Sequence, residues 1–186
     1  MAAENRDTPA VILDEKAMER TIVRISFEVV ERNRGAENLC VVGIMGGGTE
    51  IAGRIAAKIG QIEGREIEVG SLDITPHRDD GGRTIGGDRS SIPFDISDKR
   101  VVLVDDVLYT GRTVRAAIDA IMSRGRPKNI QLAILIDRGH RELPIRSDFV
   151  GKNVPTAAEE KIVVHTKGRH GADEVLLYRR GSKAEG

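Results

Sequence analysis

The sequence predicts an α/β protein whose central, mostly parallel sheet is flanked by helices. Aliphatic runs at 39–44, 101–104 and 130–136 predict strands, and helical patterns separate them. Strands that alternate with helices form parallel sheets, and nearly unbroken aliphatic runs indicate strands covered on both faces. A chain of 186 residues suits one core, so we expect a single domain over 1–186.

The composition gives no sign of a strongly basic, a disulfide-bonded, a membrane-spanning or a secreted protein. Lys plus Arg equals Asp plus Glu at 29 each, so an RNA site would have to be one basic face balanced by acidic surface elsewhere. The single Cys40 cannot form an internal disulfide. No apolar run approaches the ~20 residues that span a bilayer, and the start of the chain lacks a secretory signal. We expect a cytoplasmic protein with no membrane partner and with disorder over 1–10.

The first predicted elements are a helix, a strand and a second helix. The helix covers 13–33, with Asp14 as its N-cap and an end near Gly35. Its charged face by itself indicates only a solvated surface. The strand at 39–44 leads through three glycines into a helix over 49–59. Glycines let backbone N–H groups approach an anion at a helix start, so we expect pyrophosphate there.

A polar segment follows the next predicted strand, which covers 66–75. Residues 76–91 are rich in glycine and have almost nothing to bury, so we expect this segment to be mobile without a ligand. A plain disordered linker is the alternative. Near the C-terminus, apolar runs at 161–165 and 174–178 predict a terminal strand pair.

The segment 100–124 joins a buried strand, a turn rich in hydroxyl groups and an amphipathic helix. We expect the strand to end at Asp105 and Asp106, which places two carboxylates where open α/β sheets bind ligands. The helix start that follows attracts an anion. The predicted phosphate-binding residues are Val107, Leu108, Tyr109, Thr110, Gly111, Arg112 and Thr113.

This turn matches neither GxxxxGK[ST] nor GxGxxG, the two common nucleotide-binding patterns. Carboxylates before it can bind ribose hydroxyls while the turn binds a 5′-phosphate, so the predicted ligand is a phosphorylated ribose. The plain alternative is that the two aspartates only cap a loop and that Thr110 only caps a helix.

VVLVDDVLYTGRT at 101–113 resembles the phosphoribosyl-pyrophosphate signature of type I phosphoribosyltransferases. LDIT at 72–75, RDD at 78–80 and IQLAILIDRGHRELPIRSDFVGKNVPT at 130–156 are similar to the PyrR family. The resemblance implies the type I phosphoribosyltransferase fold, with 76–91 as a flexible hood loop. It also implies a regulator that attenuates pyrimidine operons by binding messenger RNA and has uracil phosphoribosyltransferase activity.

The resemblance further implies that uracil and phosphoribosyl pyrophosphate give UMP and pyrophosphate, with Mg²⁺ as cofactor. Asp105 and Asp106 would be catalytic and would reach Mg²⁺ directly or through ribose hydroxyls or water. The implied pyrophosphate site is Gly46, Gly47, Gly48 and Arg78, and the implied uracil site is Ile136, Asp137 and Arg138. Tyr109 stands where purine-type relatives usually carry an acidic residue, which favours a pyrimidine.

The implied partner is the leader messenger RNA of a pyrimidine operon, and we also expect a homodimer or a higher homo-oligomer. The expected RNA-binding residues are Arg24, Arg32, His140, Arg141, Arg146 and Lys152. Two features depart from the family. Gly46 and Gly47 replace a Thr-Arg pair in the pyrophosphate loop, and Val23 and Phe27 stand where relatives often carry polar or basic side chains.

Three functions therefore remain open. The chain can be a bifunctional regulator and enzyme, an RNA-binding regulator with decayed catalysis, or a salvage enzyme that binds no RNA. The glycine loop separates the first two, because an arginine donor to pyrophosphate is worth roughly 1.5–3 kcal/mol.

Overall fold

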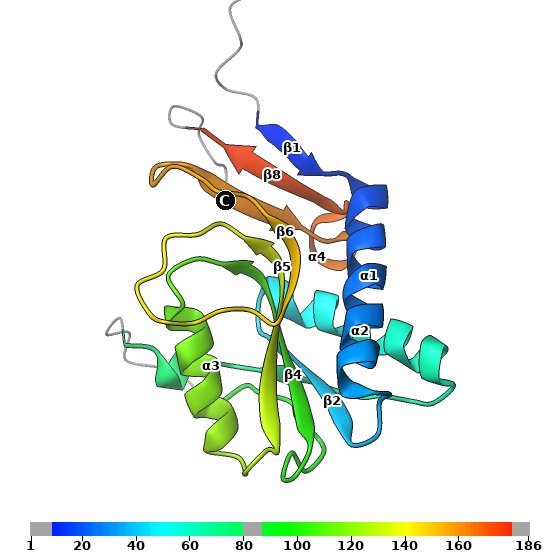
Figure 1. Ribbon diagram of the computed structural model, residues 1–186. Coiled ribbons are helices and arrows are strands. Elements are labelled where there is room, and N and C mark those ends of the chain that lie inside the picture. The colour runs from blue at the N-terminus through cyan, green and yellow to red at the C-terminus, as the bar shows by residue number, and fades with distance from the viewer. Residues whose placement is uncertain (1–8, 80–86, 180–186) are drawn as a thin grey trace, which may run out of the picture.

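A computed structural model describes residues 9–79 and 87–179 of the protein (Figure 1). Five strands form a parallel sheet in the order β3-β2-β4-β5-β6, which confirms the predicted fold class. The strands are β2 (Leu39–Ile44), β3 (Glu68–Leu72), β4 (Arg100–Leu108), β5 (Asn129–Asp137) and β6 (Phe149–Asn153). Helices α1 (Glu15–Asn33) and α2 (Gly47–Glu63) cover one face, and α3 (Arg112–Met122) covers the other.

Two apolar cores explain the continuous aliphatic runs. Val102 and Val104 of β4 belong to the core under α1 and α2, whereas Val101 and Leu103 belong to the core under α3. All four side chains are buried. Successive residues of a strand face opposite sides, so a strand covered on both faces is apolar throughout. Each such side chain contributes roughly 1.5–3 kcal/mol by burial.

A smaller antiparallel sheet, β1-β8-β7, lies at the top of Figure 1. Strands β7 (Lys161–His165) and β8 (Glu174–Tyr178) confirm the predicted terminal pair, and the short helix α4 (Lys167–His170) joins them. Strand β1 (Ala10–Leu13) was not predicted. Ala10 pairs with Leu177, so the expected disorder over 1–10 is wrong at this residue. Residues 1–8 lie outside the described part of the chain.

The helix boundaries follow their capping residues. The Asp14 side chain accepts a hydrogen bond of 2.7 Å from the N–H of Ala17, which confirms the predicted N-cap of α1. Arg34 ends α1 with a φ of 55°, one residue before the predicted Gly35. Helix α2 begins at Gly47, earlier than predicted, because Gly46 already leaves the strand conformation with a φ of 121°. No helix among the described residues is long and apolar enough to cross a membrane.

The prediction that Asp105 and Asp106 end their strand is wrong. Strand β4 continues through both aspartates, and its pairing with β5 extends from Arg100↔Asn129 to Leu108↔Asp137. Backbone hydrogen bonds to a neighbouring strand therefore override the local polarity of the two carboxylates. As a result, both side chains are carried by a rigid strand and not by a loop.

The last residues of the segment 76–91 are fastened to β3 and to Asp73, which follows it, and Asp73 also holds Thr75, just before the segment. Ser91 pairs with Ser71, and the carboxylate of Asp73 accepts hydrogen bonds from Arg89 Nε (2.8 Å) and the N–H of Thr75 (3.0 Å). Asp73 is only 3 % exposed, and the bond from Arg89 holds the pKa of its carboxyl well below the usual range. The described ends of the predicted mobile segment are thus held in place. The prediction for 80–86 falls outside the described residues.

Candidate active site

The two aspartates of β4 lie beside the glycine turn between β2 and α2. Strand β2 pairs with β4, so the carboxyl ends of both strands meet at one edge. A Cβ on Gly47 would lie 1.9 Å from Oδ2 of Asp106, and a Cβ on Gly48 would lie 2.5 Å from the carbonyl oxygen of Val104. Only glycine permits this close approach. The structure therefore brings together the predicted catalytic pair and the predicted pyrophosphate-binding glycines.

The two carboxylates have different surroundings. Asp105 is 7 % exposed, and its Oδ1 accepts a hydrogen bond of 2.9 Å from the N–H of Asp106. Burial, and after it the charge of Asp106, raise the pKa of Asp105 well above its ordinary value. Asp106 is half-buried, and its Oδ1 accepts from the N–H of Val107 at 2.7 Å. We expected both carboxylates in an open crevice, but only Asp106 is appreciably accessible.

The turn between β4 and α3 leaves a helix start open to an anion. Gly111 is the N-cap residue of the helix, with a φ of 93°, and it makes no side-chain cap hydrogen bond. The first N–H groups of a helix have no intrahelical partner and carry partial positive charge. The hydroxyl of Thr110 lies here too, accepting from the N–H of Arg112 at 3.3 Å. The predicted phosphate-binding residues 109–113 thus surround one helix start, whereas Val107 and Leu108 belong to β4.

The Arg112 side chain is engaged by two carboxylates. Its Nη1 lies 2.7 Å from Asp79 Oδ2, and its Nε lies 2.6 Å from Glu142 Oε2. Glu142 and then Asp79 raise the pKa of Arg112. Three segments meet at Arg112: the residues after β3, through Asp79; the turn between β4 and α3, which we call the phosphate turn; and the loop between β5 and β6, through Glu142. Arg78, the remaining predicted pyrophosphate ligand, directly precedes Asp79 and therefore lies near α3.

The predicted uracil residues stand at the end of β5. Ile136 is fully buried, and the backbone N–H of Arg138 donates to the carbonyl of Leu108 at 3.1 Å. The Arg138 guanidinium lies over the Tyr109 ring, 4.1 Å from its centroid. It also donates to the carbonyl of Glu160 at 2.7 Å and to the hydroxyl of Thr156 at 3.0 Å. Arg138 therefore holds Tyr109 against the loop before β7.

Three of the predicted RNA-binding residues gather where α1 packs against β6. Arg24 donates to the carbonyls of Val150 (3.1 Å) and Gly151 (2.5 Å) and pairs with Glu28. Arg32 pairs with Asp148 at 2.9 Å, and Lys152 donates to the carbonyl of Ile12 at 3.3 Å. Acidic neighbours therefore neutralise part of this charge.

The other three lie on the loop that connects β5 to β6. The His140 ring contacts the carbonyl of Thr156 at 2.6 Å and meets Tyr109 edge-on at 5.7 Å. Arg141 pairs with Asp137, and Arg146 is exposed. The structure thus places the expected RNA residues around β6 and the loop before it.

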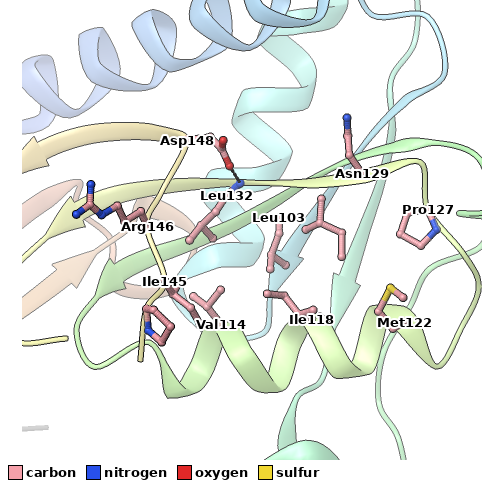
Figure 2. A pocket seen from close by; sticks show the side chains of 12 residues that line it. Leu103, Val114, Ile118, Met122, Pro127, Asn129, Leu132, Ile145, Arg146 and Asp148 are labelled. Atoms are coloured by element: carbon pink, nitrogen blue, oxygen red, sulfur yellow. Dashed lines mark hydrogen bonds between the residues drawn. The ribbon is translucent and has the colours of Figure 1, made fainter. Parts of the chain in front are cut away.

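Two hollows flank the loop before β6. The hollow in Figure 2 has a volume of about 380 Å³ and lies between α3 and β5. Its walls are apolar, and Arg146 and Asp148 close one end. A second hollow of about 780 Å³ is lined by Arg141, Arg146, Asn153 and neighbouring residues. Neither hollow is lined by Asp105 or Asp106, so both are separate from the carboxylate pair.

Carboxylate oxygens suit Mg²⁺, which keeps several water or substrate oxygens as ligands. Asp105 and Asp106 supply such oxygens beside the glycine turn. Within 9–79 and 87–179, no cluster of three or more His, Cys, Asp or Glu could hold a metal by itself. The arrangement therefore fits an ion that is held mainly through a bound substrate.

Sequence reasoning missed three acidic residues of the site. Asp73 had a local signal, because it follows an apolar strand as Asp105 does. Asp79 and Glu142 had none, because their roles depend on the side chain of Arg112, which is distant in sequence.

Comparisons with known proteins agree with this geometry. The family model described as Phosphoribosyl transferase domain matches residues 10–166. The chain is 56% identical over 176 residues to the Bifunctional protein PyrR of Bacillus cereus strain AH820, covering 91% of this chain and 97% of the relative. The protein of the same name from Bacillus mycoides strain KBAB4 gives the same figures.

Solved structures of similar fold include two purine enzymes. A hypoxanthine phosphoribosyltransferase of Trypanosoma cruzi, in complex with the product IMP, has a TM-score of 0.71 at 14% identity, covering 97% of this chain and 98% of that chain. A hypoxanthine-guanine phosphoribosyltransferase of Bacillus anthracis has a TM-score of 0.70 at 16% identity, covering 95% and 100%. These identities show the fold alone. The family model and the relatives at 56% identity establish that the chain belongs to the type I phosphoribosyltransferases and, among them, to the PyrR family.

Proposed function

We propose that the chain converts uracil and phosphoribosyl pyrophosphate to UMP and pyrophosphate, and that it regulates pyrimidine-operon expression by binding leader messenger RNA in response to UMP. One observation supports catalysis most directly: Asp106 lies against the glycines that follow β2, and its own strand, β4, leads into the open start of α3. The 56% identity to proteins named bifunctional supports both activities.

The two helix starts would hold the two ends of the substrate. The 5′-phosphate would bind at the start of α3, and the pyrophosphate would bind at Gly46–Gly48, the N-cap and first turn of α2. This orientation would keep C1 of the ribose between them, which lowers the entropic barrier to reaction. N1 of uracil forms its bond to C1 as the bond to pyrophosphate breaks, and the N1 proton is lost.

Asp106 would act by its charge. Positive charge develops on the sugar as pyrophosphate leaves, and a fixed carboxylate nearby stabilises it. Asp105 would keep Asp106 in place through the hydrogen bond between Asp105 Oδ1 and the N–H of Asp106. Mg²⁺, when bound, supplies neutralisation of the pyrophosphate charge, and Asp105 and Asp106 are the residues that would hold it.

The aspartate prediction can be tested with one substitution. Asp106→Asn should lower kcat/KM by about tenfold or more, which is about 1.4 kcal/mol, because the developing charge loses its partner. Asp119→Asn, a change of a half-exposed carboxylate on α3, is the matched control and should leave the rate unchanged. Pyrophosphate release with uracil is the measurement. Wild-type protein that binds phosphoribosyl pyrophosphate yet releases no pyrophosphate would favour decayed catalysis.

The choice of uracil is supported by Tyr109. This residue offers no carboxylate to the N7 side of a purine, and Arg138 and His140 flank its ring. Uracil should therefore give a higher kcat/KM than hypoxanthine in the same assay. A higher kcat/KM with hypoxanthine than with uracil would instead support a purine salvage enzyme.

The regulatory half is supported by a direct connection between the phosphate turn and the loop before β6. The carbonyl of Thr110 accepts hydrogen bonds from the N–H groups of Glu142 (2.9 Å) and Leu143 (3.1 Å). UMP at the turn would therefore bias the loop that carries part of the expected RNA surface. The coupling must be reciprocal, typically five- to 150-fold for about 1–3 kcal/mol. Titration of leader RNA at fixed salt, with and without UMP, tests it, and identical dissociation constants would contradict it.

We further propose a cytoplasmic homodimer or higher homo-oligomer. In support, Val69 on the edge strand β3 is exposed, and it borders a hollow of about 600 Å³ on α2 that is lined largely by small residues. Sedimentation of the wild type and of Val69→Lys would show whether this edge joins two copies, because a charge there should favour the monomer. A monomeric wild type would refute the proposal.

A further inference from the structure

Arg141 bonds to oxygens in three segments at once. Its guanidinium pairs with Asp137 at the end of β5 and donates to the carbonyls of Tyr109 and Ile145, each at 2.9 Å. The carbonyl of Gly139, at 3.3 Å, is a fourth acceptor. The side chain is only 23% exposed. Arg141 therefore connects the phosphate turn to the middle of the loop before β6.

Arg146 provides a natural contrast on the same loop. It carries the same charge and also lines the hollow of about 780 Å³, but its side chain is exposed. An exposed arginine can reach an RNA phosphate without giving up other contacts. Arg141 would first have to abandon bonds to one carboxylate and three carbonyls, which Arg146 does not have to do.

The shape of the guanidinium matters here. Its planar fork of five N–H donors can serve several oxygens at fixed angles, whereas a lysine ammonium is a compact point charge with three donors. Any shift of the turn at Tyr109 when a phosphate binds changes the geometry at Arg141, and through Arg141 the position of Ile145. The Arg112–Glu142 ion pair and the two hydrogen bonds to the carbonyl of Thr110 also connect these segments, so loss of Arg141 would not release the loop completely.

We infer that Arg141 is a positioning residue that couples phosphate binding at the turn to the conformation of the loop 138–148, and that it does not contact RNA phosphates. This inference rests on the proposed function and deepens it, because it names the residue that carries the regulation. It also separates Arg141 from Arg146, with which it was grouped as an expected RNA ligand.

The experiment compares Arg141→Lys, Arg141→Gln and Arg146→Gln. Binding of the leader RNA of the pyrimidine operon in its own genome is measured with and without saturating UMP, over a series of salt concentrations. In Arg141→Lys, RNA affinity without UMP should stay within about threefold of wild type, because the charge is kept. The enhancement by UMP, typically five- to 150-fold in wild type, should fall severalfold, because only the connections through Thr110 and Arg112 remain.

Arg146→Gln should behave differently. It should weaken RNA binding by the same factor with and without UMP, and it should reduce the slope of log affinity against log salt by about 0.7, the value for one phosphate contact on a single strand. Arg141→Gln should keep the wild-type slope. An Arg141→Lys protein that retains the wild-type UMP enhancement would overturn the inference, as would a slope in Arg141→Gln that falls as it does in Arg146→Gln.

A second readout needs no RNA. Hydrogen exchange of the backbone N–H groups of 139–143, 145 and 146 should slow when UMP binds to wild type and should slow much less in Arg141→Lys, at UMP concentrations that calorimetry shows to be saturating for both. If the wild type binds no leader RNA, the RNA half of the proposed function fails, while this measurement still decides the role of Arg141. Equal protection by UMP in both proteins, or no protection in wild type, would reject that role.

Discussion

The two strand–turn–helix units, β2 to α2 and β4 to α3, share one backbone plan. Their strands are neighbours in the sheet, and each helix begins after a glycine with positive φ, 121° at Gly46 and 93° at Gly111. Neither helix has a side-chain cap within the described residues. Both starts therefore offer free N–H groups to an anion.

The side chains around the two starts differ. The α3 turn carries threonine hydroxyls and is fastened by Arg141 and by two N–H groups of the loop after β5. The α2 turn consists of glycines, and the carboxylate of Asp106 lies against it. A pyrophosphate there meets a negative neighbour, which opposes binding unless a cation such as Mg²⁺ intervenes. The backbone makes both sites possible, and the neighbouring charges decide what each can hold.

The largest expected effect on stability is at Gly48 of α2, and Gly53 of the same helix serves for comparison. Gly48→Ala would place Cβ 2.5 Å from the carbonyl oxygen of Val104, and the backbone of a central strand cannot retreat. The free energy of unfolding should fall by about 3 kcal/mol. Gly53→Ala is the control on the same helix, where no atom lies within 4 Å, and it should gain about 0.4–1 kcal/mol. Urea denaturation measures both, and equal midpoints would show that the close approach is unimportant.

A smaller effect concerns the buried carboxylate beside the α2 turn. Burial raises the pKa of Asp105 in the folded protein, whereas in the unfolded chain it is about 3.9. The folded state then binds the proton more tightly, so this group lowers stability as pH rises above about 4. Asp105→Asn should keep the bond to the N–H of Asp106 and should be more stable than wild type at pH 8, because the buried charge is removed.

The stability gain of Asp105→Asn should disappear near pH 4, where the wild-type carboxyl is protonated. Melting temperatures at the two pH values test this sign. Asp119→Asn is again the control, since its carboxylate is half exposed. A gain that does not depend on pH would mean that the charge of Asp105 is not the cause.

The smallest effect on stability is expected at Gly47. Its added Cβ would meet the Asp106 side chain, which can rotate, so Gly47→Ala should cost only about 0.5–1.5 kcal/mol. The displaced carboxylate should nevertheless lower kcat severalfold. Steady-state rates and unfolding curves measured on the same protein should show a large loss of kcat with a small loss of stability. At Gly48 the main loss is expected in stability. Unchanged kcat in Gly47→Ala would indicate that Asp106 need not lie against the turn.

The sequence by itself determined the elements with a strong local signal. Helix α1 with its Asp14 cap, the buried runs of β2, β4 and β5, and the pair β7–β8 all follow from residue periodicity and capping. The strands β1 and β6 were not predicted, because β1 has only four residues and β6, which reads FVGKN, has large apolar side chains at its first two positions only. The glycines and aspartates of the candidate site were also evident, because adjacent residues of unusual type mark them.

Only the tertiary structure decided how these residues are used. Asp105 looked like the end of a strand and proved to be a buried part of it, because β5 continues the pairing. Arg112, Arg138 and Arg141 were expected to bind phosphate, uracil and RNA, yet each bonds to oxygens of residues 2 to 33 positions away. A charged side chain binds whichever oxygens the fold brings within reach, and the identity of those oxygens depends on which loops meet in space. Local sequence does not contain that information.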